Sequence, residues 1–386
     1  MRFIHTADWH LGRLFHNSHL TEDQRFTLDG LLRLAQTSRA DAVVIAGDVF
    51  DRAVPPPDAV TLLDETVAGL ALELGVAVVM IAGNHDSPAR LEYFSELARK
   101  VGVHVVGRVG AEVRAAEVRG ADGTEVCFWP VAYTDPETAR AEMGRGDLHT
   151  HEEVMAAQLE TISRGMGGSP RNVVVGHAFV AGCRQSESER ELTVGGTAAV
   201  SASLFSDFDY VALGHLHERQ TAGSERIRYS GSLLKYSFSE TDQAKSVTMV
   251  DLGPGGEVSV QEVGLPIRRD VRRVRGPFAE LLSRDVDQQL SEAYVEVILT
   301  NADPILNPVD KLLERFPHLL SLRREESERV LTGPGAGSSG IKARSTAELF
   351  EDFFRDVSGH SVTEAQSGEL AATLNDLERV AREVTA

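Results

Sequence analysis

The chain has 386 residues, 42% of them hydrophobic and 25% charged, which is the composition of a folded protein with one large domain and one or two smaller ones. No apolar run approaches the roughly 20 residues of a membrane span, the N-terminus reads as a strand rather than a signal peptide, and two cysteines are too few for a zinc–thiolate cluster, so we expect a cytoplasmic protein. The net charge of −19 argues against a protein that coats nucleic acid by charge neutralisation, unless bound divalent cations reverse the field at one site.

The first part of the chain alternates apolar strand-like runs with amphipathic stretches. We expect a strand at "RFIHTAD", a helix near residues 21–38, a strand at "AVVIAGD" and a helix over residues 58–73. A strand at "VAVVMIAG" follows, and then a helix near residues 88–101. This alternation predicts βαβ units with parallel strands.

The later strands lie closer together in the sequence. "VCFWPVAY" precedes a helix over residues 152–164, and the strands that follow it are "NVVVGH", "DYVALGH", "RIRYSGS", "SVTMVDL" and "EVSVQEV". We therefore predict an α/β fold in which two packed β-sheets are flanked by helices, rather than a single open sheet. We assign this domain to residues 1–265.

The composition changes after residue 265. "PIRRDVRRVRG" concentrates basic residues, and we expect a smaller α+β capping domain over residues 266–332. A flexible linker over residues 333–344 and a helical tail over residues 345–386 complete the chain. The linker is close to the pattern of a phosphate-binding loop, but Lys342 comes one residue late and no Ser or Thr follows it directly, so we reject an ATP site.

The basic segment has two open interpretations. It forms either a stripe that binds a DNA backbone or a solvated edge strand whose charges prevent further pairing. Its arginines are Arg268, Arg269, Arg272, Arg273 and Arg275. Arg13 and Arg90 follow the metal-binding motifs closely and could contact DNA, but a role in surface salt bridges explains them equally well. The DNA-contacting residues therefore stay unknown.

The tail contains an amphipathic helix. Ser345 and Glu348 form a capping box, and its apolar face consists of Leu349, Phe350, Phe353 and Phe354. On a helix tethered by a flexible linker, such a face is typical of a surface that docks in the groove of a partner protein. The alternative is that the tail folds back on its own domain.

Polar side chains follow five of the expected strands. Taken singly, each could cap a helix or be a hydrogen-bonded histidine at the rim of a sheet. Taken together, they repeatedly follow a glycine and belong to the types that bind divalent cations. Imidazole, carboxylate and amide oxygen without thiolate suit manganese, iron or zinc, and a carboxylate can bridge two metals. The residues are Asp8, His10, Asp48, Asp51, Asn84, His85, His177, His215 and His217.

The series D-x-H, G-D-x-x-D, G-N-H-D, G-H and G-H-x-H, in this order, resembles the calcineurin-like metallophosphoesterase superfamily. Within it, "HTADWHLGR", "AGDVFDR" and "AGNHDSPARL" are similar to the nuclease subunits of a bacterial complex for DNA break processing. The capping domain and the tail also match the layout of those subunits, so the resemblance covers nearly the whole chain.

The resemblance implies two metal positions with separate ligands. The first metal would be held by Asp8, His10 and His217. The second would be held by Asn84, His177 and His215, with Asp48 bridging both metals. Manganese is the activating ion that the resemblance implies. His85 would protonate the leaving 3′ oxygen or stabilise its charge without binding metal.

The resemblance also implies a reaction and partners. The reaction is hydrolysis of DNA phosphodiesters, exonucleolytic at duplex ends and endonucleolytic on single strands or hairpins, in repair, recombination and replication. The partner is an ATPase with long coiled coils, bound through the C-terminal helices in an assembly with two copies of each chain. Two alternatives keep the fold: a phosphatase acting on phosphoproteins or nucleotides, and a non-catalytic adaptor.

The orientation of His85 is a separate question. A general acid must present one N–H to the leaving oxygen, so its other ring nitrogen needs a hydrogen-bond partner. Asp51 lies on the loop after the neighbouring strand, and Asp86 is adjacent in the sequence. Because consecutive side chains usually point apart, we favour the Asp51 carboxylate over Asp86.

Overall fold

The computed structural model describes most of the chain in two compact units, Met1–Glu325 and Glu326–Ala386. In the first unit it describes residues 1–110, 113–166, 171–190, 192, 198–301 and 305–325. In the second it describes residues 350–351, 354–355, 360–363, 366–368, 370 and 373. In these parts of the chain, no helix is long and apolar enough to cross a membrane.

The first sheet has six strands in the order β16-β15-β1-β4-β5-β6. Strands β1, β4, β5 and β6 are parallel, as the βαβ pattern predicts. The two strands on the other side of β1 are antiparallel to their neighbours. The bounds are β1 Arg2–Thr6, β4 Ala42–Ala46, β5 Ala77–Ile81, β6 Val103–Val106, β15 Val247–Leu252 and β16 Val258–Val263.

The second sheet also has six strands, in the order β13-β14-β12-β9-β8-β7. Its four middle strands are parallel, and the outermost strand on each side is antiparallel. The bounds are β7 Ala116–Arg119, β8 Glu125–Val131, β9 Asn172–His177, β12 Tyr210–Gly214, β13 Gln220–Thr221 and β14 Ile227–Tyr229.

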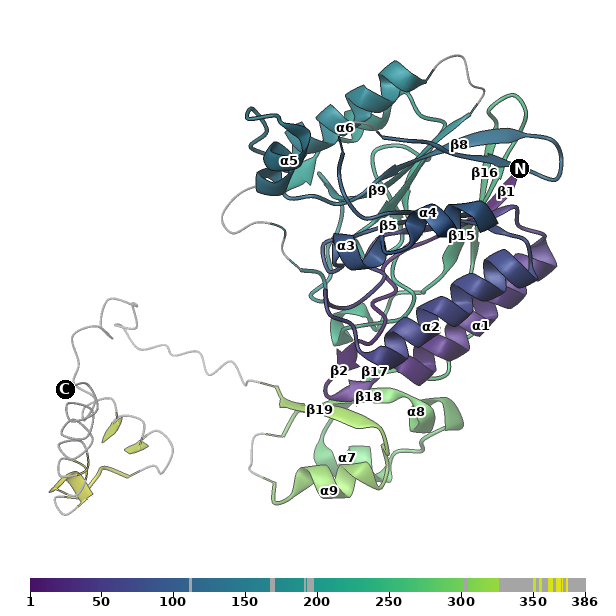
Figure 1. Ribbon diagram of the computed structural model, residues 1–386. Coiled ribbons are helices and arrows are strands. Elements are labelled where there is room, and N and C mark those ends of the chain that lie inside the picture. Colours follow the sequence, from purple (N-terminus) through teal and green to yellow (C-terminus); the bar gives the residue numbers. More distant parts are fainter. Residues whose placement is uncertain are drawn as a thin grey trace. The chain divides into compact units, whose positions relative to one another are not determined.

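The two sheets pack face to face around an apolar core. Phe3 of the first sheet contacts Phe128 of the second edge to face, with ring centroids 5.2 Å apart, and Val44 and Val175 belong to the same buried cluster. Helices α1 (Thr21–Ser38) and α2 (Pro57–Ala68) lie side by side on the outer side of the first sheet, and α6 (His151–Gly165) covers the second (Figure 1). The predicted sandwich of two sheets flanked by helices is therefore confirmed.

The expected helix over residues 88–101 is wrong as a single element. The segment forms α3 (Pro88–Leu91), α4 (Ser95–Ala98) and a 3-10 turn, η2 (Arg99–Val101). Phe94 between them is left-handed, with φ 61°. The apolar side chains of this segment mostly point to solvent, so no buried face stabilises one continuous helix. The helix expected over residues 58–73 instead ends as a π-turn, η1 (Gly69–Glu73).

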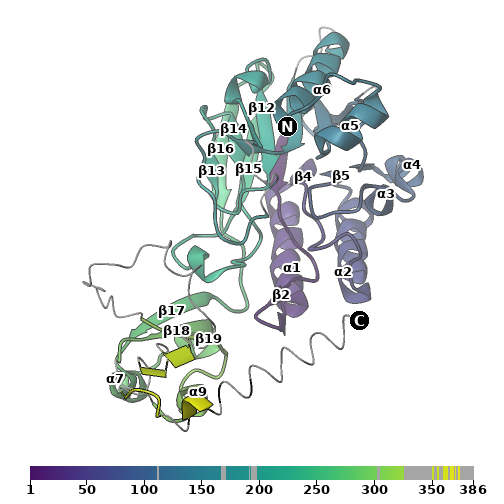
Figure 2. The same ribbon diagram turned by 90° about the vertical axis from the view of Figure 1, so that its left-hand side faces the viewer.

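The end of the first unit forms a small parallel sheet in the order β17-β18-β19, with helices between its strands. Its bounds are β17 Val271–Gly276, α7 Phe278–Ser283, α8 Gln288–Glu292, β18 Tyr294–Leu299, α9 Pro308–Leu313 and β19 Leu319–Arg324. The Tyr294 hydroxyl donates to Asp23 Oδ2 of α1 at 3.0 Å, which fixes this sheet below the large sandwich (Figure 2).

Short elements connect these parts. They are β2 Leu14–Phe15, β3 Ser18–His19, α5 Pro136–Met143, β10 Phe179–Val180, β11 Ala199–Val200, η3 Ala202–Phe205 and η4 Phe238–Glu240. The expected linker, residues 333–344, lies outside the described residues, as do Ser345, Glu348, Leu349 and Phe353 of the tail. Of the predicted aromatic face, Phe350 and Phe354 have ring centroids 6.4 Å apart.

Candidate metal centre

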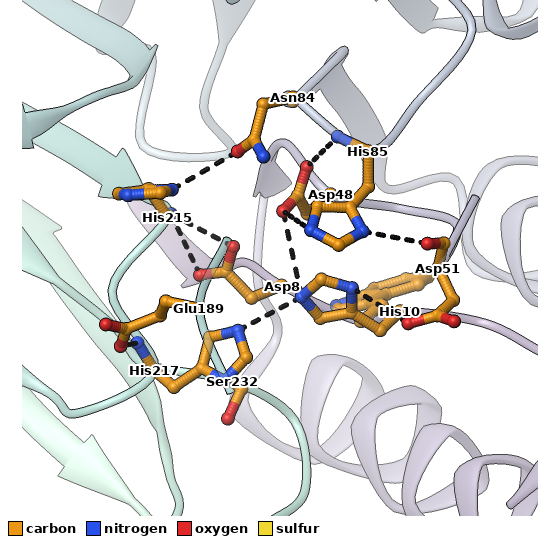
Figure 3. Close-up of polar contacts among 12 residues, drawn as sticks. Asp8, His10, Asp48, Asp51, Asn84, His85, Glu189, His215, His217 and Ser232 are labelled. Atoms are coloured by element: carbon orange, nitrogen blue, oxygen red, sulfur yellow. Dashed lines mark hydrogen bonds and ion pairs between the residues drawn. The ribbon is translucent and has the colours of Figure 1, made fainter. Parts of the chain in front are cut away.

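The ends of five strands meet at one edge of the sandwich. Three belong to the first sheet (β1, β4, β5) and two to the second (β9, β12). Because parallel strands present their carboxyl ends at the same edge, the loops that follow them gather their side chains in one place. The structure brings together every predicted metal ligand at this edge, and Figure 3 draws most of them.

One group consists of Asp8, His10 and His217, whose candidate donor atoms lie within 4.8 Å of one another. His10 Nε2 is 3.0 Å from His217 Nε2 (Figure 3). Ser188 Oγ lies 2.7 Å from His217 Nδ1, the opposite nitrogen of that ring. With Nδ1 protonated toward Ser188, the Nε2 lone pair of His217 faces His10. Such a close approach suits a shared cation.

A second group consists of Asn84, His177 and His215. Asn84 Oδ1 lies 2.9 Å from His177 Nε2 and 3.2 Å from His215 Nδ1. His177 Nδ1 donates to the Ala46 carbonyl oxygen at 2.9 Å, which leaves its Nε2 as an acceptor. Two acceptors at hydrogen-bond distance, with no proton between them, are stabilised by a cation that both can bind.

Asp48 lies between the two groups. Its Oδ2 is 3.7 Å from His10 Nε2, and its Oδ1 is 3.6 Å from His177 Nε2. The His85 backbone N–H also donates to Asp48 Oδ1 at 2.9 Å, which holds the carboxylate in this orientation. Each oxygen of Asp48 therefore faces one group, as a bridging carboxylate requires.

The electrostatics of the site fit divalent cations. Burial, and then the charge of Asp48, raise the pKa of Asp8. Burial lowers the pKa of all four imidazoles, that of His217 to about 3, so these rings are neutral and keep a lone pair for a metal. Two buried carboxylates and four neutral imidazoles, without a thiolate, form a donor set for divalent metals.

The backbone of the site is held in conformations that side chains rarely adopt. Asp8, His10, Asp48 and His215 have φ values of 52°, 45°, 47° and 102°. Such outliers cluster at functional sites, where the surrounding fold enforces them. Two of the glycines before the ligands are required sterically, since a Cβ on Gly83 would lie 2.1 Å from Asp48 Oδ1 and one on Gly214 would lie 1.9 Å from the Ala46 oxygen.

The structure differs from the expected orientation of His85. His85 Nδ1 donates to the backbone carbonyl oxygen of Asp51 at 2.8 Å rather than to its carboxylate (Figure 3). Asp51 Oδ1 instead accepts from Arg13 Nη1 at 2.9 Å and lies 3.5 Å from His10 Nδ1. The predicted carboxylate contact is therefore wrong, because the loop after β4 turns its backbone, not its side chain, toward His85.

Asp86, the rival for that role, is buried beneath the loops. Its carboxylate accepts three backbone N–H groups, from Val49 at 3.1 Å, Phe50 at 2.8 Å and Gly83 at 2.9 Å. Burial, and then the charge of Asp48, raise its pKa to about 7, against the effect of these donors. Asp86 thus ties the loop after β4 to the loop after β5.

Several residues of the site were not predicted. Gln24 of α1 donates to the Trp9 and His10 carbonyl oxygens at 3.0 and 2.8 Å and holds the first ligand loop. Glu240 and Ser188 surround His217. None of these positions lies in a motif, and only the folded arrangement of distant loops brings them to the site.

The basic segment is paired with acidic residues. Arg268 and Arg269 lie 3.9 and 3.7 Å from Asp23, and β17 is an edge strand of the small sheet. The other pairs are Arg272 with Asp270, Arg273 with Glu296, and Arg275 with Glu325. These contacts favour the interpretation as a charged edge strand over a free phosphate-binding stripe.

Comparisons with known proteins agree with this geometry. A family model described as calcineurin-like phosphoesterase matches residues 1–219. A second model, named for the C-terminal part of SbcD and described as type 5 capsule protein repressor C-terminal domain, matches residues 267–358. The chain is 29% identical over 378 residues to the SbcD subunit of nuclease SbcCD from Staphylococcus epidermidis, covering 97% of this chain and 98% of that protein. These matches confirm the resemblance to such nuclease subunits.

Two solved structures are also similar to this chain. One is a dimetal phosphatase from Danio rerio, with 14% identity and a TM-score of 0.41, covering 68% of this chain and 96% of that chain. The other is GAP50 of Plasmodium, with 12% identity and a TM-score of 0.39, covering 69% of this chain and 89% of that chain.

Proposed function

The chain belongs to the calcineurin-like phosphoesterase family, and from that premise we propose that it is the nuclease subunit of an SbcCD-type complex. It hydrolyses DNA phosphodiesters with two manganese ions, as an exonuclease at duplex ends and an endonuclease on single strands and hairpins. Its cellular role is DNA break processing, recombination and replication, in the cytoplasm. The observation that carries the proposal is the position of Asp48, whose two oxygens face two separate groups of ligands.

The ligands divide between two positions. Asp8, His10 and His217 would hold one ion, while Asn84, His177 and His215 would hold the other. Divalent cations bound there supply Lewis acidity and a nucleophilic water for attack on the phosphoester. Asp48 would bridge the two positions, and its buried neighbours exclude bulk water from the ligands.

His85 acts on the leaving group. Its Nδ1–H is committed to the Asp51 carbonyl oxygen, so Nε2 is the nitrogen available to the substrate. That atom is 3.9 Å from Asp48 Oδ2, and the side chain is 13% exposed, in contrast to the buried ligands. The carbonyl fixes the orientation of the ring, so that Nε2–H of the imidazolium donates to the leaving 3′ oxygen.

DNA is the favoured substrate because of the part of the chain after residue 265. The three-stranded sheet docked on α1 is an addition that a minimal phosphatase of phosphoproteins or nucleotides does not need. A curated relative that matches 97% of the chain is named a nuclease. A non-catalytic adaptor is disfavoured because every ligand position carries a side chain able to bind metal.

The tail contacts the SbcC-type ATPase subunit. The aromatic side chains Phe350 and Phe354 stack near each other, and Phe350 is 42% exposed. Exposed aromatic groups on a helix are typical of a surface that docks in a partner's groove.

The chain forms a homodimer within a heterotetramer. The segment that follows the His85 loop exposes four large apolar side chains, whose exposed fractions are 73%, 60%, 64% and 50%. They are Tyr93, Phe94, Leu97 and Val101. Exposed apolar side chains gathered in one segment are typical of a protein interface.

The test is hydrolysis of linear duplex DNA and of hairpins with manganese, with and without the ATPase subunit. We expect manganese-dependent degradation that His177→Ala abolishes and that His149→Ala, an exposed histidine outside the site, leaves unchanged. Hydrolysis of phosphopeptides or nucleotides without hydrolysis of DNA would assign the chain to the phosphatases instead. Hydrolysis of none of these would favour the adaptor.

A further inference from the structure

Glu240 is a buried carboxylate beside the candidate metal centre. It has 0% exposure and ends η4, far in sequence from every ligand motif. Its Oε2 accepts from Lys245 Nζ at 2.6 Å and from the Tyr236 backbone N–H at 3.2 Å. Its Oε1 accepts from the Ser188 hydroxyl and lies 3.3 Å from His217 Nδ1. These contacts fix both oxygens of the carboxylate.

The same contacts determine the protonation of the His217 ring. The Ser188 hydroxyl has one proton and donates it to Glu240, so at 2.7 Å from His217 Nδ1 it must act as an acceptor. Nδ1 therefore carries the hydrogen, and the lone pair is on Nε2, which faces His10. The ring is held with its metal-binding nitrogen toward the first position.

The backbone of His217 is fixed by charged groups as well. Its N–H donates to Glu189 Oε1 at 2.7 Å, and its carbonyl oxygen accepts from Lys245 Nζ at 2.8 Å. Lys245 thus contacts both Glu240 and the residue that Glu240 orients. Loops from two other parts of the chain, residues 188–189 and residues 240–245, therefore contact one histidine.

In the part of the chain that the structure describes, no carboxylate is hydrogen-bonded to an imidazole ring of the second position. His177 Nδ1 donates to a neutral carbonyl, that of Ala46, and within the described residues His215 Nε2 has no hydrogen-bond partner. Asn84 contributes a neutral amide. A carboxylate behind a metal-binding imidazole fixes the tautomer of the ring and raises its basicity. The contacts of Glu240 give this support to His217 at the first position.

We propose that Glu240 is a positioning residue that holds His217, directly and through Ser188, with Nε2 toward the first metal position, so that its loss weakens binding of one ion only. The inference rests on the proposed function because it requires that the site bind metal. Removal of such a partner typically lowers metal affinity roughly 10- to 100-fold.

The experiment is a calorimetric titration of the metal-stripped full chain with manganese, in backgrounds that isolate each position. Asn84→Ala leaves the first position intact, and His10→Ala leaves the second. Glu240→Gln is added to each background. Ser188→Ala, at a partly exposed residue, is a second variant. It removes the hydroxyl that lies between Glu240 and His217 and retains the ion pair of Glu240 with Lys245.

The matched control is Glu296→Gln. Glu296 is also buried, with 3% exposure, and pairs with Arg273 at 2.6 Å in the small sheet away from the site. It should leave both affinities unchanged.

We expect Glu240→Gln to weaken manganese binding roughly 10- to 100-fold in the Asn84→Ala background and not at all in the His10→Ala background. Ser188→Ala should give a smaller loss in the first background only. Equal losses in both backgrounds, or no loss in either, would overturn the positioning role. If the unmodified chain binds no manganese, the proposed function fails first, and this inference fails with it.

Discussion

Replacement of Gly83 by alanine tests the geometry of the site without removing any ligand. A Cβ at this position would lie 2.1 Å from Asp48 Oδ1 and 2.3 Å from the Asp48 backbone nitrogen. Ordinary contacts between non-bonded carbon atoms are about 3.5 Å. The loops after β4 and β5 must therefore separate by more than about 1 Å, and Asp48 is the residue that moves.

The expected loss follows from the position of Asp48. Its oxygens lie 3.6 Å from His177 Nε2 and 3.7 Å from His10 Nε2, so a shift toward one group is a shift away from the other. A displacement of about 1 Å in a catalytic arrangement costs about 100-fold in rate. Overpacking itself should lower the free energy of unfolding by about 1–3 kcal/mol.

The assay is single-turnover cleavage of duplex DNA at saturating manganese, with metal content measured on the same samples. Gly146→Ala is the control, because a Cβ there meets no heavy atom within 4 Å. We expect a loss of about 100-fold for Gly83→Ala and none for the control. Cleavage by Gly83→Ala at the unmodified rate with both ions bound would refute the close approach of these loops.

Three further predictions concern other parts of the chain. Asp51→Asn should leave His85 oriented, because His85 Nδ1 donates to the backbone carbonyl oxygen of residue 51. It should instead weaken manganese binding at the first position roughly tenfold, since the carboxylate lies beside His10. A loss of rate by orders of magnitude at saturating manganese would show that the Asp51 carboxylate does orient His85. Burial lowers the pKa of His5 from 6.5 to about 3, so its contribution to stability is present above pH 6.5 and is lost as the pH falls toward 3. In His5→Gln, the slope of the unfolding free energy against pH should be smaller between pH 6.5 and 3, by up to about 1.4 kcal/mol per pH unit. Equal slopes for the variant and the unmodified protein would contradict this. Deletion of residues 341–386 should preserve manganese-dependent nuclease activity on simple substrates but prevent co-purification with the ATPase, whereas unchanged affinity for that partner would place the interface elsewhere.

The strand ends were predictable because the local pattern and the global fold agree. A buried apolar run followed by glycine and a polar residue defines the end of a strand, and parallel strands must bring such ends to one edge. The helix expected near residues 21–38 is also present, since its apolar face packs on the first sheet.

Other features depend on contacts that no local pattern encodes. The strand β15 pairs with β1 across almost the whole first domain, and nothing in "SVTMVDL" specifies that neighbour. Glu240 reaches His217 only because η4 folds back over the loop after β12. His85 Nδ1 donates to the backbone carbonyl oxygen of Asp51, whereas the prediction was its carboxylate. A backbone contact depends on the path of the loop rather than on residue type.

The central claim is that two metal ions share Asp48, and a manganese titration of the unmodified chain and of Asp48→Ala tests it most directly. We expect two ions per unmodified chain, and in Asp48→Ala a loss of affinity at both positions together with the loss of DNA hydrolysis. Two tightly bound manganese ions in Asp48→Ala, or a single ion in the unmodified chain, would contradict the account.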